Sequence, residues 1–284
     1  MTAIRKKIGI FIPCYNVEKS IRDVLSHFSP SVLNQIEQLV AVDNLSKDNT
    51  FSILREIQQT SALLKSKMVI IKNSENYGLG GSQKIAYQYL IDHQFSHFMI
   101  IHGDNQGNGE EIAHRFLDVF QRNPEIDLVL ASRFHPQANI AGYSGLRRVG
   151  NHFFNVITYY LTGHKMNDAG TGIMFIRAEI LKEIPFGALT NSFQFNPQLN
   201  IFLYNLQGLK TQEVPLNWRD SKVGSNIQAL DYCLTLLKIL IRYRMNKTLF
   251  KKRGAELFGQ VSQAFHPRFD VFVPDIEANL GAHT

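Results

Sequence analysis

The sequence has few cysteines and no long hydrophobic run, and each absence excludes a class of protein. Cys14 and Cys233 are the only cysteines among its 284 residues. Neither lies in a CxxC pair or another metal-ligand spacing, so a reducing compartment such as the cytoplasm is expected. No segment reaches the ~18 uncharged apolar residues that span a bilayer. The apolar run at residues 8–12 ends at Pro13 and is too short for a secretory leader, so it predicts a strand.

Acidic residues are in the minority, which bears on the chemistry of the partner. Lys and Arg number 30 against 24 Asp and Glu, for a formal net charge of +6. With 44% apolar and 19% charged residues the chain is not disordered and can build one sizeable core. A basic balance suits nucleic acid, nucleotide phosphates or acidic lipid head groups without choosing among them. No recognised nucleic-acid module occurs, so no nucleic-acid partner is expected.

Apolar strand-like runs alternate with helical patterns through the first half of the chain. The runs are rich in Ile and Val and lie at residues 8–12, 39–42, 68–71, 98–101 and 128–131. The helical patterns lie between them, at residues 18–28, 50–59, 81–92 and 110–122. This alternation predicts an α/β fold with a mostly parallel central sheet flanked by helices. Ligands of such sheets bind beyond the carboxyl ends of the strands.

The second half is less regular and ends in an amphipathic pattern. Helices are expected at residues 146–161, 197–206 and 226–244, and short strands at 174–176 and 211–218. The sequence predicts one domain over residues 1–225 and a C-terminal helical appendage over residues 226–284. The last helix has an apolar stripe and is followed by the basic stretch RYRMNKTLFKKR, which favours contact with an anionic membrane surface. The alternative is a helix packed on the domain with a solvated basic run.

The stretch IIHGDNQGNGEE ends an apolar strand in polar side chains. His102, Asp104 and Gln106 alternate, so in extended backbone they point the same way. A divalent cation that bridges a diphosphate usually takes only one or two protein carboxylates, and Asp104 could provide one. A histidine ligand suits manganese better than magnesium. The alternative is a polar loop before a helix.

Two further strand ends resemble nucleotide sites. In VAVDNLSKDNT, Asp43 could accept a hydrogen bond from a base N–H or a ribose hydroxyl; the alternative is a capped turn without a ligand. In SENYGLGGSQKIA, glycines from Gly78 onward precede a helix and would let phosphate approach its N–H groups. A tight turn explains the same glycines.

Basic and acidic residues of the second half complete the candidates. Arg133 directly follows a strand, and the LRR stretch adds two forked phosphate donors or a solvated helix face. Asp168, before Ala-Gly-Thr-Gly, is a buried base, an orienting group or an Asx turn. The segment EVPLNWRDSKVGSN carries a basic pair, Arg219 and Lys222, in a polar loop that could close on a diphosphate.

In this order the motifs resemble those of family-2 glycosyltransferases of the GT-A fold, most closely the dolichyl/polyprenyl-phosphate sugar transferase branch. IFIPCYNVEKSI resembles the opening strand and its Pro-x-Tyr-Asn turn, and HGDNQGNGEEI falls where the family has Asp-x-Asp-x-Gln. The resemblance covers about residues 7–244. The chain departs from the pattern at Asn44 and His102, where the family has aspartates, and at Asn49, where it has glycine.

The resemblance implies four groups of site residues. Catalysis is assigned to Asp104, Arg133 and Asp168. Nucleotide binding is assigned to Pro13, Tyr15, Asn16, Asp43, Asn44, Gly78 and Asp104. The diphosphate and acceptor side takes Arg133, Arg147, Arg148, Thr171, Arg219 and Lys222. A divalent cation, Mn²⁺ or Mg²⁺, is implied at His102, Asp104 and Gln106.

The implied reaction is inverting transfer of a sugar from a nucleoside diphosphate, with a UDP-hexose as the expected donor. The acceptor is a polyprenyl phosphate, which needs no general base, or a glycan or lipid hydroxyl, for which Asp168 would be the base. Cell-envelope polysaccharide or glycolipid synthesis, at the inner face of the membrane, is the expected setting. Many relatives on this branch add membrane-spanning helices that the sequence lacks, which weakens the interpretation of the acceptor as a lipid. The alternative is a non-catalytic nucleotide-sugar-binding protein with a degenerate metal site.

Overall fold

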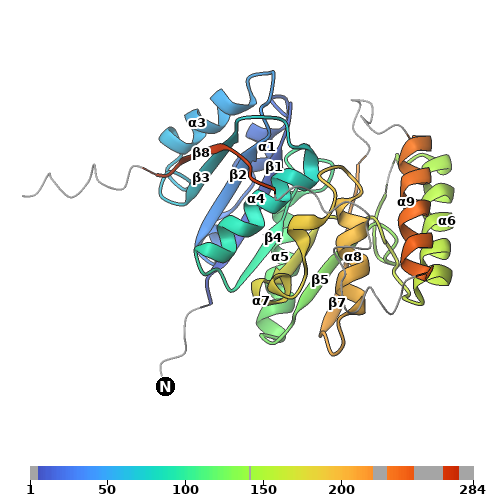
Figure 1. Cartoon of the computed structure of the whole chain (residues 1–284). Coiled ribbons are helices and arrows are strands. Elements are labelled where there is room, and N and C mark those ends of the chain that lie inside the picture. The colour runs from blue at the N-terminus through green and yellow to red at the C-terminus, as the bar shows by residue number, and fades with distance from the viewer. Residues whose placement is uncertain (1–5, 141, 220–228, 246–264, 275–284) are drawn as a thin grey trace, which may run out of the picture.

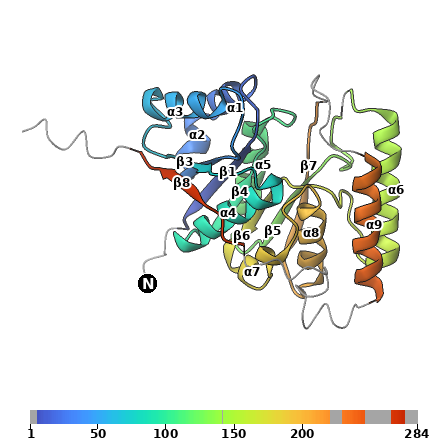
Figure 2. The ribbon, with the colours of Figure 1, turned by 45° about the horizontal axis from the view of Figure 1, so that its top comes forward.

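One mixed sheet organises the chain. The computed structural model describes residues 6–140, 142–219, 229–245 and 265–274 (Figure 1). Its eight strands are hydrogen-bonded in the order β7-β5-β6-β4-β1-β2-β3-β8. Helices cover both faces of this sheet (Figure 2). The predicted α/β fold is therefore confirmed.

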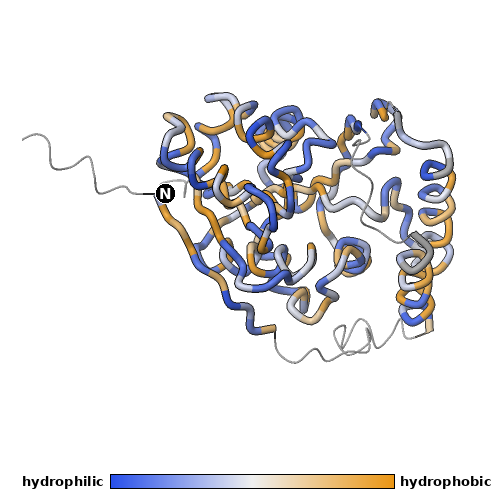
Figure 3. The backbone as a smooth tube through the Cα atoms, turned by 90° about the horizontal axis from the view of Figure 1, so that it is seen from above, coloured by the Kyte–Doolittle hydropathy of each residue, from blue (hydrophilic) through white to orange (hydrophobic). Residues whose placement is uncertain are grey.

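The middle of the sheet is parallel and fully buried. It consists of β1 (Ile8–Cys14), β2 (Gln38–Asp43), β3 (Met68–Asn73) and β4 (His97–Ile100). β1 pairs with β2 and β4, and β2 pairs with β3, all in parallel. Both faces of the sheet are covered by helices, so alternate residues of one strand pack into the hydrophobic cores on opposite faces. The strands are therefore continuous apolar runs in the sequence (Figure 3). This is why the strand positions could be predicted.

The other half of the sheet changes direction. β5 (Leu128–Ser132) pairs in parallel with β7 (Thr211–Pro215). Between β5 and β4 lies β6 (Met174–Arg177), antiparallel to both. Among the described strands, four neighbouring pairs are parallel and three are antiparallel. Strand direction depends on long-range pairing, so the apolar pattern of β6 did not reveal it.

Helices pack on each face around an aliphatic or an aromatic core. One face carries α1 (Ile21–Ser26), α2 (Pro30–Leu33), α3 (Thr50–Thr60) and α5 (Gly109–Arg122) over aliphatic residues of β1 and β2. The other carries α4 (Gly78–Asp92), α7 (Ala178–Lys182), the 3₁₀ turn η1 (Phe186–Ala188) and α8 (Phe195–Asn205). Its centre is Tyr87, whose ring contacts those of Phe11, Phe98, Phe186 and Phe195. These aromatic contacts fix how α4 and α8 lie on the sheet.

Two helices form a layer at the end of the molecule beyond β7. α6 (Gly145–Thr162) and α9 (Ala229–Met245) pack against each other there (Figure 2). The Ser144 hydroxyl caps the start of α6, and Gly163, at a φ of 80°, ends it. Tyr243 of α9 is buried and donates a 2.6 Å hydrogen bond to Asn205 of α8. The inner side of α9 is thus part of the core. No helix in the described ranges is long and apolar enough to cross a membrane.

The C-terminal part of the chain returns to the opposite edge of the sheet. β8 (Phe269–Phe272) is antiparallel to β3, with Val271 opposite Ile71. Gln58 of α3 donates a 2.8 Å hydrogen bond to the Phe272 carbonyl. The division into residues 1–225 and 226–284 stays a prediction, and both α9 and β8 contact the first of these regions. Residues 226–228, before α9, and 247–253, with most of the basic run, lie outside the described residues.

Candidate active site

Most of the predicted site residues gather where parallel strands end. The backbone N–H of Asn44, after β2, donates a 2.9 Å hydrogen bond to the Cys14 carbonyl at the end of β1. Gly103, after β4, lies so close to β1 that an added Cβ would be 3.1 Å from the Pro13 carbonyl oxygen. β5 brings Arg133 to the same edge of the sheet. The ends of β1, β2, β4 and β5 therefore form one continuous site region.

The loop after β4 carries the predicted metal ligands. His102 is half-buried, and its Nε2 is enclosed without a hydrogen-bond partner. Burial lowers the pKa of His102, with Asp104 opposing the shift and Arg133 adding to it. The neutral imidazole that results is the form that binds metal. Asp104 lies in the same turn, where its Oδ1 accepts a 3.2 Å hydrogen bond from the Gln106 N–H.

His102, Asp104 and Gln106 could supply some, but not all, of the ligands that a divalent cation needs. No group of three His, Cys, Asp or Glu residues that could hold a metal occurs in the described part of the chain. His102 and Asp104 offer one nitrogen and one carboxylate, and the Gln106 amide is a third donor of the same loop. A cation held by so few protein groups takes its remaining ligands from phosphate oxygens and water. The loop therefore fits a cation that arrives with, or is completed by, a diphosphate.

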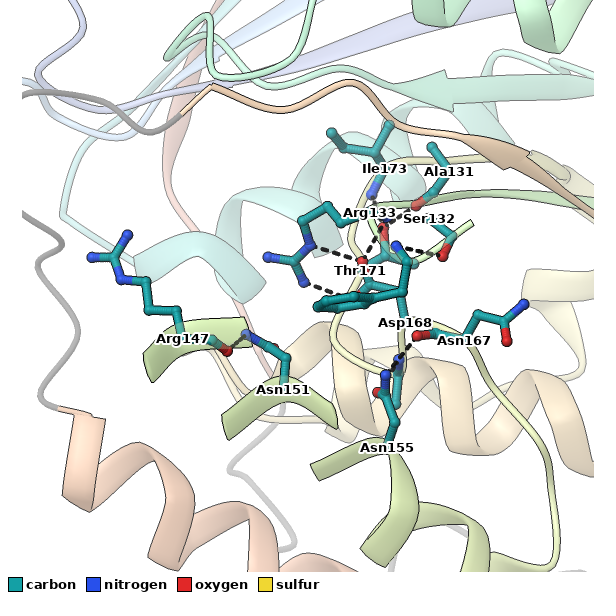
Figure 4. A network of polar contacts seen from close by, with 12 residues as sticks. Ala131, Ser132, Arg133, Arg147, Asn151, Asn155, Asn167, Asp168, Thr171 and Ile173 are labelled. Atoms are coloured by element: carbon teal, nitrogen blue, oxygen red, sulfur yellow. Dashed lines mark hydrogen bonds and ion pairs between the residues drawn. The ribbon is translucent and has the colours of Figure 1, made fainter. Parts of the chain in front are cut away.

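Arg133 and Asp168 form a buried, two-pronged ion pair (Figure 4). Arg133 Nε and Nη2 each lie 2.7 Å from a different carboxylate oxygen of Asp168, and the Arg133 N–H donates to it at 3.1 Å. The Asp168 side chain is 1% exposed and that of Arg133 16%. Burial alone would lower the pKa of Arg133, but Asp168 outweighs it and raises that pKa above its usual value. The guanidinium stays charged beside the site, with the Trp218 ring 5.6 Å away.

Two side-chain amides hold the loop that carries Asp168. Asn155 of α6 accepts a 3.0 Å hydrogen bond from the Ala169 N–H, and Asn200 of α8 donates to the carbonyls of Ala169 and Thr171. The Thr171 hydroxyl donates to the Ala131 carbonyl of β5 at 2.7 Å. Thr171 is thus a loop anchor. Asn155 and Asn200 were not predicted, because isolated asparagines in helices carry no pattern that separates them from surface residues.

The nucleotide side is built around Asp43. Asp43 is fully buried; its Oδ2 accepts a 3.4 Å hydrogen bond from the Ser46 N–H, and its Oδ1 has no partner. Burial raises the pKa of Asp43, and the bonds from Ser46 oppose this. Pro13 and Tyr15 flank the end of β1, and Asn16, at a φ of 53°, accepts a 2.8 Å hydrogen bond from the Lys47 N–H. The Oδ1 of Asp43 therefore has the capacity to accept a hydrogen bond from an N–H group of a ligand.

Asn44 is the centre of an amide cluster. Its Oδ1 accepts 2.9 Å hydrogen bonds from the Asn73 amide and the Tyr77 N–H, and its Nδ2 donates to Asn76 Oδ1 at 2.7 Å. The same Asn76 oxygen accepts from the Gly78 N–H at 2.9 Å. A carboxylate at position 44 could not make the bond to Asn76. The asparagine at this position is therefore matched to its neighbours.

The Asn44→Asp substitution restores the residue found in the family pattern, yet it is expected to destabilise this chain. It places a carboxylate oxygen against Asn76 Oδ1, which cannot rotate away without losing the Gly78 bond. The expected loss is about 1–3 kcal/mol of unfolding free energy, measured by urea denaturation. Asn34→Asp, at an exposed position directly after α2, is the control and should change little. Equal stability of the Asn44 and Asn34 variants would contradict the cluster.

The glycines at the start of α4 are explained by packing. Gly78 has a φ of 72°, and an added Cβ would lie 2.4 Å from the Asn191 carbonyl oxygen; Gly80 approaches the Thr190 carbonyl equally closely. The Gly81 N–H donates to Asn191 at 3.2 Å. The N–H groups of Gly78 and Gly81 bond within the protein, and the role of Gly78 in nucleotide binding stays a prediction.

The remaining basic candidates are spread out. Arg219 lies beside the loop after β4, where its backbone N–H donates a 2.8 Å hydrogen bond to the Gln106 carbonyl. Arg147 and Arg148 are exposed at the start of α6, and Figure 4 shows the Arg147 side chain directed away from Arg133. Lys222 lies outside the described residues. Of the three arginines that the structure describes, Arg219 is therefore the one whose backbone lies next to the predicted metal ligands.

Tyr232 of α9 is a site neighbour that the sequence analysis missed. It is half-buried against the aromatic core and interacts electrostatically with Arg133 and Asp168. Burial raises its pKa to about 12, with Arg133 opposing and Asp168 adding to the rise. Its place in the sequence, 64 residues after Asp168, gave no sign of this proximity. Tyr232 therefore brings α9 within electrostatic range of the Arg133–Asp168 pair.

Comparison with known proteins identifies this architecture. The central mixed sheet with helices on both faces has the GT-A fold. Residues 9–185 match the model of glycosyl transferase family 2, so the chain belongs to this family of glycosyltransferases.

Two of its relatives act on polyprenyl phosphates, according to their names. The UDP-N-acetylglucosamine–dolichyl-phosphate N-acetylglucosaminyltransferase of Methanococcus voltae is 26% identical over 62% of this chain and 72% of that protein. The undecaprenyl-phosphate 4-deoxy-4-formamido-L-arabinose transferase of Yersinia enterocolitica is 24% identical over 83% of this chain and 67% of that protein.

Solved structures share the fold. Glucosyl-3-phosphoglycerate synthase of Mycobacterium tuberculosis superposes with a TM-score of 0.58 at 16% identity, covering 85% of this chain and 80% of that one. The same enzyme has been solved with Mn²⁺ and UDP-glucose, with a TM-score of 0.57 at 18% identity, covering 88% and 79%. At this identity the likeness concerns the fold.

Proposed function

We propose that this glycosyltransferase moves a hexose from a UDP-sugar to a polyprenyl phosphate, with inversion at the anomeric carbon. The observation that carries the choice of acceptor is the Arg133–Asp168 pair. Asp168 was the predicted base for a hydroxyl acceptor, but both of its carboxylate oxygens accept hydrogen bonds from Arg133. A phosphate acceptor is already an anion and attacks without a base. The relatives named for dolichyl and undecaprenyl phosphate support this acceptor.

Asp43 supports a uridine donor. Its Oδ1 is an enclosed acceptor without a donor, and uracil presents an N3–H that would complete it. Pro13, Tyr15, Asn16 and Asn44 would line the same base and ribose side. The Methanococcus voltae relative is named for a UDP-sugar, and solved neighbours contain UDP or UDP-glucose.

The loop after β4 would serve the leaving diphosphate. His102, Asp104 and Gln106 would hold a divalent cation, which when bound neutralises charge on the diphosphate oxygens. Mn²⁺ is the expected ion, because the ligand set contains an imidazole. Arg219 lies next to this loop and would add a guanidinium, and Lys222, Arg147 and Arg148 are proposed to act on the same side.

The reaction then needs little from the protein besides positioning and charge. An oxygen of the lipid phosphate attacks the anomeric carbon, the bond from that carbon to the diphosphate breaks, and its electron pair leaves with UDP. Arg133, held charged by Asp168, would face the growing negative charge, which preorganised donors stabilise in water-poor sites. Thr171 and Asp168 would shape the sugar and acceptor side, and Gly78 would belong to the nucleotide side. The expected setting is cell-envelope polysaccharide or glycolipid synthesis in the cytoplasm, peripheral to the inner face of the membrane.

A binding panel tests the donor. Melting temperatures would be measured with UDP-, GDP-, dTDP- and CDP-sugars, each with and without Mn²⁺ or Mg²⁺. A ligand that binds only the folded state raises the melting temperature by mass action. UDP and CDP are the matched pair, since they differ only at the base edge that would face Asp43. A metal-dependent shift with UDP-sugars and none with CDP-sugars is expected; an equal shift with both would contradict the role of Asp43. Transfer to undecaprenyl phosphate but not to free sugars would then establish the acceptor.

A further inference from the structure

The α6–α9 layer has an outward face that no described part of the chain covers. On α6, the exposed apolar side chains recur at helical spacing: Val149, Phe153, Val156 and Tyr160. On α9 they recur in the same way: Leu234, Leu237, Ile241 and Met245. Tyr160 is 75% exposed and Met245 77%. Figure 3 shows hydrophobic positions recurring along the helices at this end of the molecule.

This exposure is not a by-product of poor packing, because each helix has a separate buried side. On α9 the inward residues are Leu236, Ile239, Leu240 and Tyr243, which belong to the aromatic core. On α6 the inward apolar residues are Phe154, Ile157 and Leu161, which are partly buried and pack against the same core. Two helices with both sides apolar are unusual for a surface layer, which normally turns a polar side to water. A run of large apolar side chains in solvent indicates an interaction surface.

The charged side chains that the structure describes on α6 and α9 are all basic, and Asp231, in the first turn of α9, is the one acidic residue in the sequence of either helix. Residues 145–165, which include all of α6, contain no Asp or Glu. On α9, Lys238 and Arg244 are exposed, and at helical spacing they flank the apolar stripe on opposite sides. An apolar stripe bordered by cations is the pattern of helices that lie in the interface of an anionic bilayer. A protein partner or a second copy would be expected to require some acidic complement.

The position of this layer fits the chemistry of the site. The inner side of α6 carries Asn155, which holds the Asp168 loop, and α9 carries Tyr232 beside Arg133 and Asp168. The outward stripes and the acceptor side therefore belong to the same two helices.

We propose that the outer faces of α6 and α9 form one docking surface for an anionic lipid bilayer. Docking there would place the Arg133–Asp168 side of the site next to the head groups from which a lipid phosphate must be taken. The role of docking in supplying a lipid phosphate rests on the proposed lipid acceptor, whereas membrane docking itself does not. The apolar side chains would enter the interface, and the flanking cations would contact lipid phosphates.

The test measures binding of the full chain to vesicles by co-sedimentation, without donor or metal. Vesicles of phosphatidylcholine with phosphatidylglycerol would be compared with pure phosphatidylcholine. The wild-type chain is expected to bind the anionic vesicles and to lose binding as salt rises. Phe153→Gln with Tyr160→Gln on α6, and Leu237→Gln with Ile241→Gln on α9, should each weaken binding by about tenfold or more, since each pair removes two exposed apolar side chains that docking would bury in the bilayer.

A matched control excludes a general effect of surface polarity. Leu63→Gln replaces an apolar side chain that is 45% exposed, in the turn after α3, which Figure 1 places far from α9. This variant should bind vesicles like the wild type. All substituted side chains are exposed, so the variants should have the melting temperature of the wild type. If a double variant has a lower melting temperature, vesicle binding is compared between the wild type and the single Tyr160→Gln variant instead.

The possible outcomes separate docking from the reaction. Loss of vesicle binding with unchanged transfer to a short, water-soluble prenyl phosphate supports the docking surface. Equal vesicle binding by the wild type and both double variants overturns the docking surface. It is also overturned if the wild type is a dimer that these substitutions dissociate without changing vesicle binding. Vesicle binding without any transfer would count against the proposed reaction and leave the docking surface standing.

Discussion

Replacing Asp104 by alanine is expected to lower turnover by about three orders of magnitude while leaving the fold intact. Asp104 is the carboxylate of the loop after β4, beside His102, whose imidazole is neutral because burial lowers its pKa. Without Asp104, the cation would keep one nitrogen and one amide donor, and the leaving diphosphate would lose most of its charge neutralisation. Turnover at saturating donor is the measurement. Binding of Mn²⁺ in the presence of UDP, measured by calorimetry, gives a readout that does not depend on transfer.

The control for Asp104 is a surface carboxylate that has no part in the site. Asp118 lies on α5 and pairs with Arg122 on the surface. Asp118→Ala should keep wild-type turnover and wild-type Mn²⁺ binding. If Asp104→Ala keeps both as well, the loop after β4 is not the metal end of the site, and His102 would be a buried structural histidine.

The Arg133→Ala substitution is expected to destabilise the protein by about 3–5 kcal/mol, because it leaves Asp168 as an uncompensated buried charge. Asp168 has a side chain only 1% exposed, and Arg133 supplies both of its side-chain hydrogen bonds at 2.7 Å. Urea denaturation at neutral pH measures the loss. Turnover should also fall, since the same guanidinium is proposed to face the diphosphate.

A double variant separates the two roles of this pair. Arg133→Ala with Asp168→Ala removes both charges, so part of the lost stability should return while turnover stays low. Arg148→Ala, an exposed arginine of α6, should change stability by no more than about 0.5 kcal/mol. An Arg133→Ala variant as stable as the Arg148 variant would mean that the ion pair contributes little and that Asp168 is free to act as a base.

The sequence predicted the part of the site that depends on strand ends. Asp43, Asp104 and Arg133 follow continuous apolar runs, and the carboxyl ends of parallel strands meet at one edge of a sheet. Their proximity therefore follows from local patterns plus one topological rule. The alternation of strands and helices was enough for the fold class for the same reason.

What the sequence did not reveal depends on contacts between distant segments. The ion pair joins Arg133 to Asp168 across 35 residues, so the interpretation of the two as separate catalytic groups had no way to include their mutual bonds. From the sequence, Asn44 was only a departure from the family pattern on the nucleotide side, whereas its partners, Asn73 and Asn76, show that it is a hydrogen-bonding centre. The antiparallel direction of β6 and the nearness of Tyr232 to the ion pair are likewise products of tertiary packing.

The strand β8 has a consequence for how the C-terminal part of this chain can be studied. β8 covers the outer edge of β3, and its Phe272 carbonyl is bonded by Gln58. A chain cut after α9 would leave the edge of β3 open, and an open, flat and apolar edge invites pairing with other chains. Such a truncated protein would aggregate, and an aggregate sediments with or without vesicles. Shortening the chain is therefore a poor substitute for point changes when membrane association is measured, and a purification tag placed at the C-terminus should leave β8 in place.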